Sequence, residues 1–189
     1  FRKMESYINK LQDTICQSLE ELDTKIFHED CWKRKEGGGG RTRVLENGSL
    51  LEKGGVNVSS VNGPMSEELA KQLKTPPSFF GACGISLVLH PCSPKVPTVH
   101  MNLRYFETEE GQCWFGGGID LTPYFPYPKD FKEFHQTLRE ACEKCIPGSY
   151  DGFKKYCDEY FSLPHRQEMR GIGGIFFDHL DGFDQQHFN

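Results

Sequence analysis

The sequence lacks both an excess of basic residues and any long apolar run, and each absence excludes a class of function. Its 22 Lys and Arg residues are outnumbered by 27 Asp and Glu residues, which gives a formal net charge of -5. A chain of this charge offers no basic surface to displace counterions from phosphates, so we expect no nucleic acid partner. The longest largely apolar run, ISLVL at 85–89, is far too short to cross a bilayer, so we expect no membrane span.

Zinc-binding cysteine spacing and a phosphate-binding loop are also missing. The eight cysteines are scattered, and the CxxC pair of Cys142 and Cys145 has no second pair at zinc-finger distance. This usage predicts reduced thiols in a cytoplasmic protein. The GGGG run at 37–40 is followed by no Lys-Ser or Lys-Thr pair, so it predicts a turn instead of a phosphate site.

With 189 residues, the chain is long enough for one domain with a sizeable core. Apolar residues at helical spacing predict an amphipathic helix over 1–24, and short apolar patches between glycines predict short strands over 26–60. Further helices are predicted over 66–73, 129–144 and 150–161, and further strands over 84–91, 97–106, 113–121 and 169–180. Short turns between consecutive strands favour antiparallel pairing, so the pattern predicts an α+β domain with one antiparallel sheet.

One of these strands separates apolar from polar side chains. Strand residues alternate between two faces, so one face receives Val99, Met101, Leu103 and Tyr105, and the other receives Thr98, His100, Asn102 and Arg104. The preceding strand divides in the same way, with Ser86, Val88 and His90 on its more polar face. A solvated sheet face is the ordinary explanation for one such strand.

The next strand makes that explanation less satisfactory. A five-residue turn would place Asp120 across from His100, and Gly118 and Gly116 across from Asn102 and Arg104. Because glycine weakens a strand, its repetition indicates that something flat approaches the backbone closely. Arg104 can hold a carboxylate through two parallel hydrogen bonds, Asp120 can accept from N–H groups, and His100 can exchange a proton near neutral pH.

Four segments, taken together, resemble one known family. Residues 154–180 contain His165-Arg166, Glu168, Arg170-Gly171, Gly173-Gly174 and Phe176-Phe177-Asp178. The other three are EKGGVNVS at 52–59, the HxNxR run at 100–104 and WFGGGIDLTPYF at 114–125. These segments follow the pattern of the oxygen-dependent coproporphyrinogen III oxidases, in order and over essentially the whole chain.

The resemblance implies an oxidoreductase of haem synthesis. Such enzymes oxidatively decarboxylate two propionates of coproporphyrinogen III to vinyl groups and release protoporphyrinogen IX. Dioxygen is the co-substrate, no metal or other cofactor is required, and the enzyme is a homodimer. The implied fold is a large antiparallel sheet flanked by helices on both faces. Residues 1–189 would form a single catalytic domain, incomplete at its C-terminal end relative to the family.

The resemblance also assigns roles to residues. It implies that His100 is the general acid or base, that Ser86 and residues 102–104 contact substrate, and that Asp120 lies near the pyrrole nitrogens. Together with the strand pattern, this predicts two sets of site residues. The catalytic set is His100, Asp120 and Arg104, and the substrate-binding set is Ser86, Asn102, Leu103, Arg104, Gly116 and Gly118.

Two other functions stay open. A metal-dependent oxygenase or hydrolase could use His90, His100, His135 or His165 with Asp120, since two histidines and a carboxylate can hold iron. A tetrapyrrole-binding module without catalysis is the second alternative. Residues 165–170 are expected to form a buried ion network that fixes the sheet, and Trp32 and Trp114 are expected to be packing residues.

Overall fold

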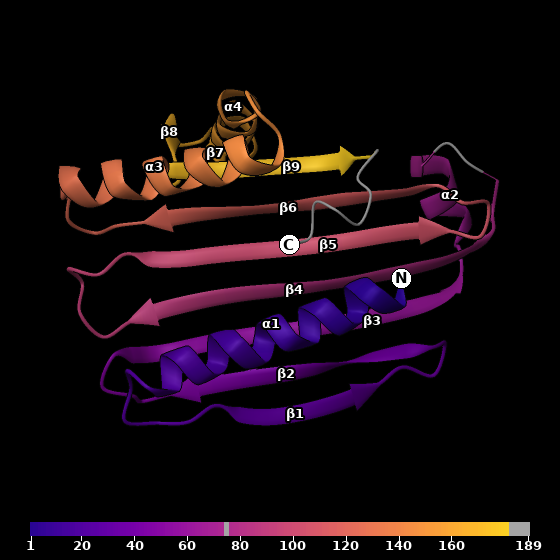
Figure 1. Cartoon of the computed structure of the whole chain (residues 1–189), viewed down its shortest axis with the longest axis horizontal. Coiled ribbons are helices and arrows are strands. Elements are labelled where there is room, and N and C mark those ends of the chain that lie inside the picture. The colour runs from indigo at the N-terminus through magenta and orange to yellow at the C-terminus, as the bar shows by residue number, and fades with distance from the viewer. Residues whose placement is uncertain (74–75, 182–189) are drawn as a thin grey trace.

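An antiparallel sheet of seven strands organises the chain, as a computed structural model shows for residues 1–73 and 76–181 (Figure 1). The strand order is β1-β2-β3-β4-β5-β6-β9, so six strands follow one another as a meander and the seventh joins after two helices. The strands are β1 (His28–Lys33), β2 (Gly38–Glu46), β3 (Leu51–Pro64), β4 (Phe79–Pro91), β5 (Thr98–Thr108), β6 (Cys113–Thr122) and β9 (Gly173–Leu180). The predicted α+β fold with an antiparallel sheet is confirmed.

The described part of the chain also forms four helices: α1 (Arg2–Glu20), α2 (Glu67–Leu73), α3 (Pro128–Cys145) and α4 (Tyr150–Tyr160). Between α4 and β9, a small hairpin pairs β7 (Ser162–Leu163) with β8 (Glu168–Met169). None of the helices in the described part of the chain has the length and hydropathy needed to span a bilayer.

The strands near the N-terminus are longer than the sequence pattern predicts. The patches expected over 26–60 are parts of β1, β2 and the 14-residue β3. Most of the GGGG run, predicted as a turn, also lies in a strand, because β2 begins at Gly38. The physical reason is visible at Gly40, where a β-carbon would collide with the Trp32 ring on the neighbouring strand. Glycine is used here to let a large ring lie against the backbone.

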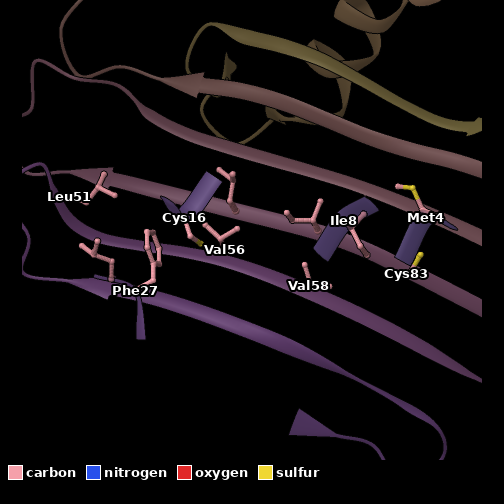
Figure 2. Close-up of a cluster of buried hydrophobic side chains, with 11 residues drawn as sticks. Met4, Ile8, Cys16, Phe27, Leu51, Val56, Val58 and Cys83 are labelled. Atoms are coloured by element: carbon pink, nitrogen blue, oxygen red, sulfur yellow. The ribbon is translucent and has the colours of Figure 1, made fainter. Parts of the chain in front are cut away.

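The main hydrophobic core lies between α1 and one face of the sheet, here called the core face (Figure 2). Ile8 of α1 is fully buried against strand residues that include Val56 of β3 and Ile85 of β4. A polar residue, Gln12, is equally buried, and its side chain makes three hydrogen bonds. Its Nε2 donates to the carbonyl oxygens of Arg41 at 2.8 Å and Val56 at 2.7 Å, and its Oε1 accepts from Arg41 Nε at 2.6 Å. These bonds fix α1 along β2 and β3.

The remaining helices are unevenly distributed over the two faces. A second core cluster joins α3 to Ile119 and Ile175, which lie on the core face of β6 and β9. Helix α4 follows the β9 edge and reaches both faces, since Phe153 packs on Phe177 and Tyr160 stacks on Phe176. Of the helices predicted on both faces, α1 and α3 cover the core face, while only α4 among the described helices, at the β9 edge, reaches the opposite face. Among residues 1–73 and 76–181, they leave much of the face opposite the core, here called the site face, open to solvent.

Asp23 fixes the connection after α1 to the hairpin between β2 and β3. Its carboxylate accepts backbone hydrogen bonds from Thr24 at 2.6 Å, Ser49 at 2.8 Å, Leu50 at 3.1 Å and Leu51 at 2.9 Å. Partial removal from water opposes ionisation, but these four donors outweigh it and hold the pKa of Asp23 well below its ordinary value.

This geometry predicts an acid-sensitive contribution to stability. Because the pKa is lower in the folded state, the contribution is present above the ordinary pKa and is lost as the pH falls toward the folded value. Asp23→Asn should lower the melting temperature at pH 7 by about 2 to 4 °C, and the difference should shrink on acidification. Thermal unfolding from pH 7 to pH 2 measures this, with the exposed Glu52→Gln as control. A difference that does not change with pH would contradict the carboxylate's role.

Candidate active site on the polar face of the sheet

The predicted strand register is confirmed. In the β5–β6 ladder, His100 lies opposite Asp120, Asn102 opposite Gly118 and Arg104 opposite Gly116. In the β4–β5 ladder, Ser86 lies opposite Asn102. The sheet therefore brings together on the site face five of the predicted polar residues: Ser86, His100, Asn102, Arg104 and Asp120. Leu103 alternates to the core face, so any substrate contact from this residue must come from its backbone.

Asp120 is the most buried charged residue of the group, with 2% of its surface exposed. Arg170 donates to both of its oxygens, from Nη2 to Oδ1 at 2.8 Å and from Nε to Oδ2 at 3.1 Å. The same guanidinium lies 3.8 Å above the ring of Phe161. Asp120 is thus held in a fixed orientation by a two-point ion pair.

Arg170 was not among the predicted site residues, although it belongs to the ion network expected over 165–170. It follows β8, and 50 positions separate it from Asp120, so neither strand alternation nor local spacing connects the two. The one indication in the sequence was that Arg170 lies in the 154–180 segment, which resembles the known family. The ion network predicted over 165–170 is found in part. Arg170 joins the buried Asp120, while Arg166 and Glu168 pair at 2.6 Å on the surface.

His100 lies beside this ion pair without forming a short hydrogen bond to it. Its Nδ1 is 3.6 Å from Oδ1 of Asp120, a distance too long for a good hydrogen bond. Burial lowers the pKa of His100 below its ordinary value. The nearby charge of Asp120 opposes this shift, and the charge of Arg170 adds to it. The ring is therefore neutral at pH 7, so one of its nitrogens can accept a proton.

Arg104 already holds a carboxylate of the chain itself. Its Nη2 lies 3.1 Å from Oδ2 of Asp178 on β9, and its Nη1 donates to Oδ1 of Asn102 at 2.9 Å. The guanidinium is also 5.5 Å from the centre of the Phe176 ring. About two fifths of the Arg104 side chain remains exposed, at 42%. A substrate carboxylate could bind this exposed part or compete with Asp178.

Gly116 and Gly118 have close neighbours within the chain. A β-carbon on Gly116 would lie 2.5 Å from Nε of Arg104 and 2.7 Å from Oδ1 of Asp178, and one on Gly118 would lie 2.7 Å from the Phe176 ring. The two glycines thus make room for the Arg104–Asp178 pair and for an aromatic ring. Their predicted contact with a flat substrate stays a prediction.

The described residues form a cavity on each face of the sheet. The first, of about 500 Å³, opens between α1 and α3 and is lined mainly by apolar side chains such as Phe115, Ile175 and Phe177. The second is a hollow of about 240 Å³ on the site face, lined by residues that include Trp32, Asn57, Ser86, Asn102 and Arg104. We place the candidate site on the second face because the polar and titratable groups converge there.

Of the histidines considered as metal ligands, His90 and His100 lie near each other on the site face, where His90 adds to the lowering of the His100 pKa, but His135 lies elsewhere. His135 faces Tyr150 and the Ile172 carbonyl, with ring nitrogens 2.8 Å and 3.1 Å from those oxygens. Within residues 1–73 and 76–181, no group of three or more His, Cys, Asp or Glu side chains is arranged to hold a metal ion. Asp120, the carboxylate of the proposed metal site, is paired with the Arg170 cation.

Fold and site together define an α+β protein that presents an imidazole, a carboxylate and guanidinium groups on one open face of its sheet, a set of groups suited to an anionic substrate. The chain belongs to the coproporphyrinogen III oxidase family, whose family model matches residues 3–189.

Individual relatives agree with this assignment. The chain is 51% identical over 186 residues to an oxygen-dependent coproporphyrinogen-III oxidase of Prochlorococcus marinus, covering 95% of this chain and 53% of the relative. It is 49% identical over 193 residues to the mitochondrial enzyme of Homo sapiens, covering 95% of this chain and 42% of that one. For the chloroplastic enzyme of Glycine max, the identity is 46% over 200 residues, covering 97% and 52%. The chain thus spans about half the length of these relatives.

Proposed function

We propose that the full-length protein carries out oxygen-dependent oxidative decarboxylation of coproporphyrinogen III to protoporphyrinogen IX. The observation that carries this proposal is the register that sets His100 opposite Asp120 on β5 and β6, with Arg104 on the same face. The names of the relatives from Prochlorococcus marinus and Homo sapiens support it. Each of the two steps converts one propionate and one dioxygen into a vinyl group, carbon dioxide and hydrogen peroxide.

In this reaction the protein positions an electron-rich substrate instead of supplying a redox group. Arg104 holds the carboxylate of the reacting propionate. Dioxygen adds to the pyrrole, and the resulting peroxide removes a proton from the β-carbon of the propionate. The carboxylate then leaves as carbon dioxide while the vinyl double bond forms, and the peroxide departs as hydrogen peroxide. His100, being neutral, can accept or return a proton beside the reacting group.

Asp120 was expected to face the pyrrole N–H groups. Its ion pair with Arg170 uses one lone pair on each oxygen, which leaves acceptor capacity for such a contact. Because Asp120 is buried, however, the side chains that cover it must move before a pyrrole N–H can contact its carboxylate. The geometry also supports a second contribution, in which the fixed negative charge of Asp120 orients the ring of His100.

The proposal is tested by incubating the full-length protein with coproporphyrinogen III in air. We expect two equivalents each of hydrogen peroxide and carbon dioxide per substrate, and the fluorescence of protoporphyrin after the product is oxidised. Binding without peroxide release would instead indicate a tetrapyrrole-binding module. Activity that is lost when bound metal is removed, and that returns when metal is added back, would indicate the metal-dependent alternative.

Three further features belong to the proposal. The reaction uses dioxygen with no metal or organic cofactor, the protein works as a homodimer, and it acts in the cytoplasm. Light scattering of the purified full-length protein tests the dimer, and elemental analysis of active protein tests the absence of metal. The relatives from Homo sapiens and Glycine max are named mitochondrial and chloroplastic, so cell fractionation is the test of the cytoplasmic location.

The carboxylate role of Arg104 gives a quantitative prediction. Arg104→Ala should raise the Michaelis constant for coproporphyrinogen III by about 10-fold to 100-fold, because one charge-assisted hydrogen bond contributes about 1.5 to 3 kcal/mol. Steady-state kinetics of the full-length protein measure this. The control is Arg139→Ala, which removes an arginine of similar exposure. Its Nη2 pairs with Oδ1 of Asp151 at 3.0 Å, away from the site. An unchanged Michaelis constant for Arg104→Ala would remove Arg104 from the carboxylate site.

A further inference from the structure

The site-face hollow adjoins the predicted catalytic residues at Arg104 and extends from there across the sheet to Trp32 of β1. The register places Thr42, Asn57, Ser86 and Asn102 side by side across β2, β3, β4 and β5. Neighbouring strands are about 4.8 Å apart, so this row of hydroxyl and amide groups extends about 14 Å across the sheet. Of these residues, Asn57 and Thr42 had no functional assignment from the sequence.

The donors in this row are available to a ligand. Ser86 is exposed and Asn57 is half-buried. Within the part of the chain that the structure describes, neither side chain hydrogen-bonds to another protein group. Asn102 is oriented by Arg104, which donates to its Oδ1, so its Nδ2 hydrogens remain as donors. Oriented N–H and O–H groups beside one another are suited to carboxylate oxygens.

Charge and size restrict what the hollow can hold. Among the described residues that line it, Arg104 is the one charged group, and its carboxylate partner Asp178 is not part of the lining. The ring of Trp32, 37% exposed, lies over Gly40 and forms an apolar wall. A volume of about 240 Å³ is below that of typical pockets for whole small molecules. The hollow therefore suits one acidic side chain of a larger substrate. Its methylene groups would lie against Trp32, and its carboxylate would lie at the amide groups of Asn57 and Asn102.

We propose that the part of this hollow between Asn57 and Trp32 is an anchoring subsite for a propionate that is not reacting, beside the position of the reacting propionate at Arg104 and His100. This inference rests on the proposed function, because a substrate with four propionates keeps two of them unchanged. Neutral donors hold a carboxylate without a full counter-charge, so they can anchor an arm that must also move when the second propionate reacts. Asn57 is a specificity-determining residue in this arrangement.

Two variants of the full-length protein test the subsite. Asn57→Asp keeps the shape of the side chain and places a negative charge against the propionate, so the Michaelis constant for coproporphyrinogen III should rise by about 10-fold or more, with kcat within about twofold. Asn57→Ala should raise it by about fivefold, since it removes a donor without adding charge. The control is Asn62→Asp, which adds the same charge at an exposed position of β3 outside the hollow.

A binding measurement without turnover separates this inference from the proposed function. Coproporphyrin III, the oxidised porphyrin with four propionates, should quench tryptophan emission on binding, and Asn57→Asp should weaken its apparent affinity by a similar factor. Turnover with unchanged Michaelis constants in both Asn57 variants would overturn the subsite and leave the function standing. Porphyrin binding that depends on Asn57, in a protein without turnover, would retain the subsite and reject the enzyme. Equal porphyrin affinities for all variants would also overturn the subsite.

Discussion

Replacing Asp120 by alanine in the full-length protein should abolish turnover of coproporphyrinogen III while the fold survives. The substitution removes the carboxylate expected at the pyrrole nitrogens and also the negative charge 3.6 Å from Nδ1 of His100. Asp120→Asn, which keeps the shape, should still lower kcat by about 100-fold or more, at the lower end of what a positioned acid–base system contributes. Peroxide release under saturating substrate measures both variants.

The control for Asp120 must separate lost chemistry from lost structure. Asp151→Asn removes a carboxylate that also pairs with an arginine but is 79% exposed on α4, so its activity should equal that of the unmodified protein. Circular dichroism of each variant establishes that the sheet is intact. Near-normal activity in a folded Asp120→Ala protein would end the assignment of Asp120 to the catalytic set.

Arg170→Met should destabilise the protein by about 3 kcal/mol, because it leaves the carboxylate of Asp120 buried without its two donors. Asp120 is 4% exposed as a side chain, so water replaces the lost hydrogen bonds poorly. Denaturant unfolding of the full-length protein measures the change as a lower transition midpoint at constant slope. Turnover should fall as well, since Asp120 would no longer be fixed.

Arg166→Met provides a matched control in the same segment. Its guanidinium pairs with Glu168 at 2.6 Å, but the two side chains are 63% and 48% exposed. Surface pairs contribute little, so the expected loss is below about 1 kcal/mol. In a double-mutant cycle, combining Asp120→Asn with Arg170→Met should cost less than the sum of the single changes. Strictly additive losses would show that the ion pair is not the source of the effect.

The strand pattern predicted how β5 and β6 pair at the site, because the alternation of side chains and a short turn between the strands allow few pairing registers. A five-residue turn between two strands sets which residues lie opposite each other, and this placed Asp120 against His100. The same logic failed for the N-terminal glycines, where a strand residue without a side chain gives no alternation to read. Gly40 belongs to β2 because Trp32 covers it, and that contact lies across a strand pair.

The reason for the glycines of β6 was also hidden in the sequence. Their spacing indicated that something lies close to the backbone. The structure places the Arg104–Asp178 pair over Gly116 and the Phe176 ring over Gly118. Asp178 and Phe176 come from β9, which joins the sheet only after α3 and α4. A pattern confined to one strand cannot reveal what a distant strand supplies.

The sequence by itself determined the antiparallel meander, the division of β5 into an apolar and a polar face, and the family, because each depends on local order along the chain. Only the tertiary structure decided that Arg170 holds Asp120, that Arg104 is paired with Asp178, and that Asn57 lies beside Ser86 in a hollow walled by Trp32. The physical reason is that ion pairs and cavities form between elements far apart in sequence, and their geometry is set when β9 and the N-terminal strands complete the sheet.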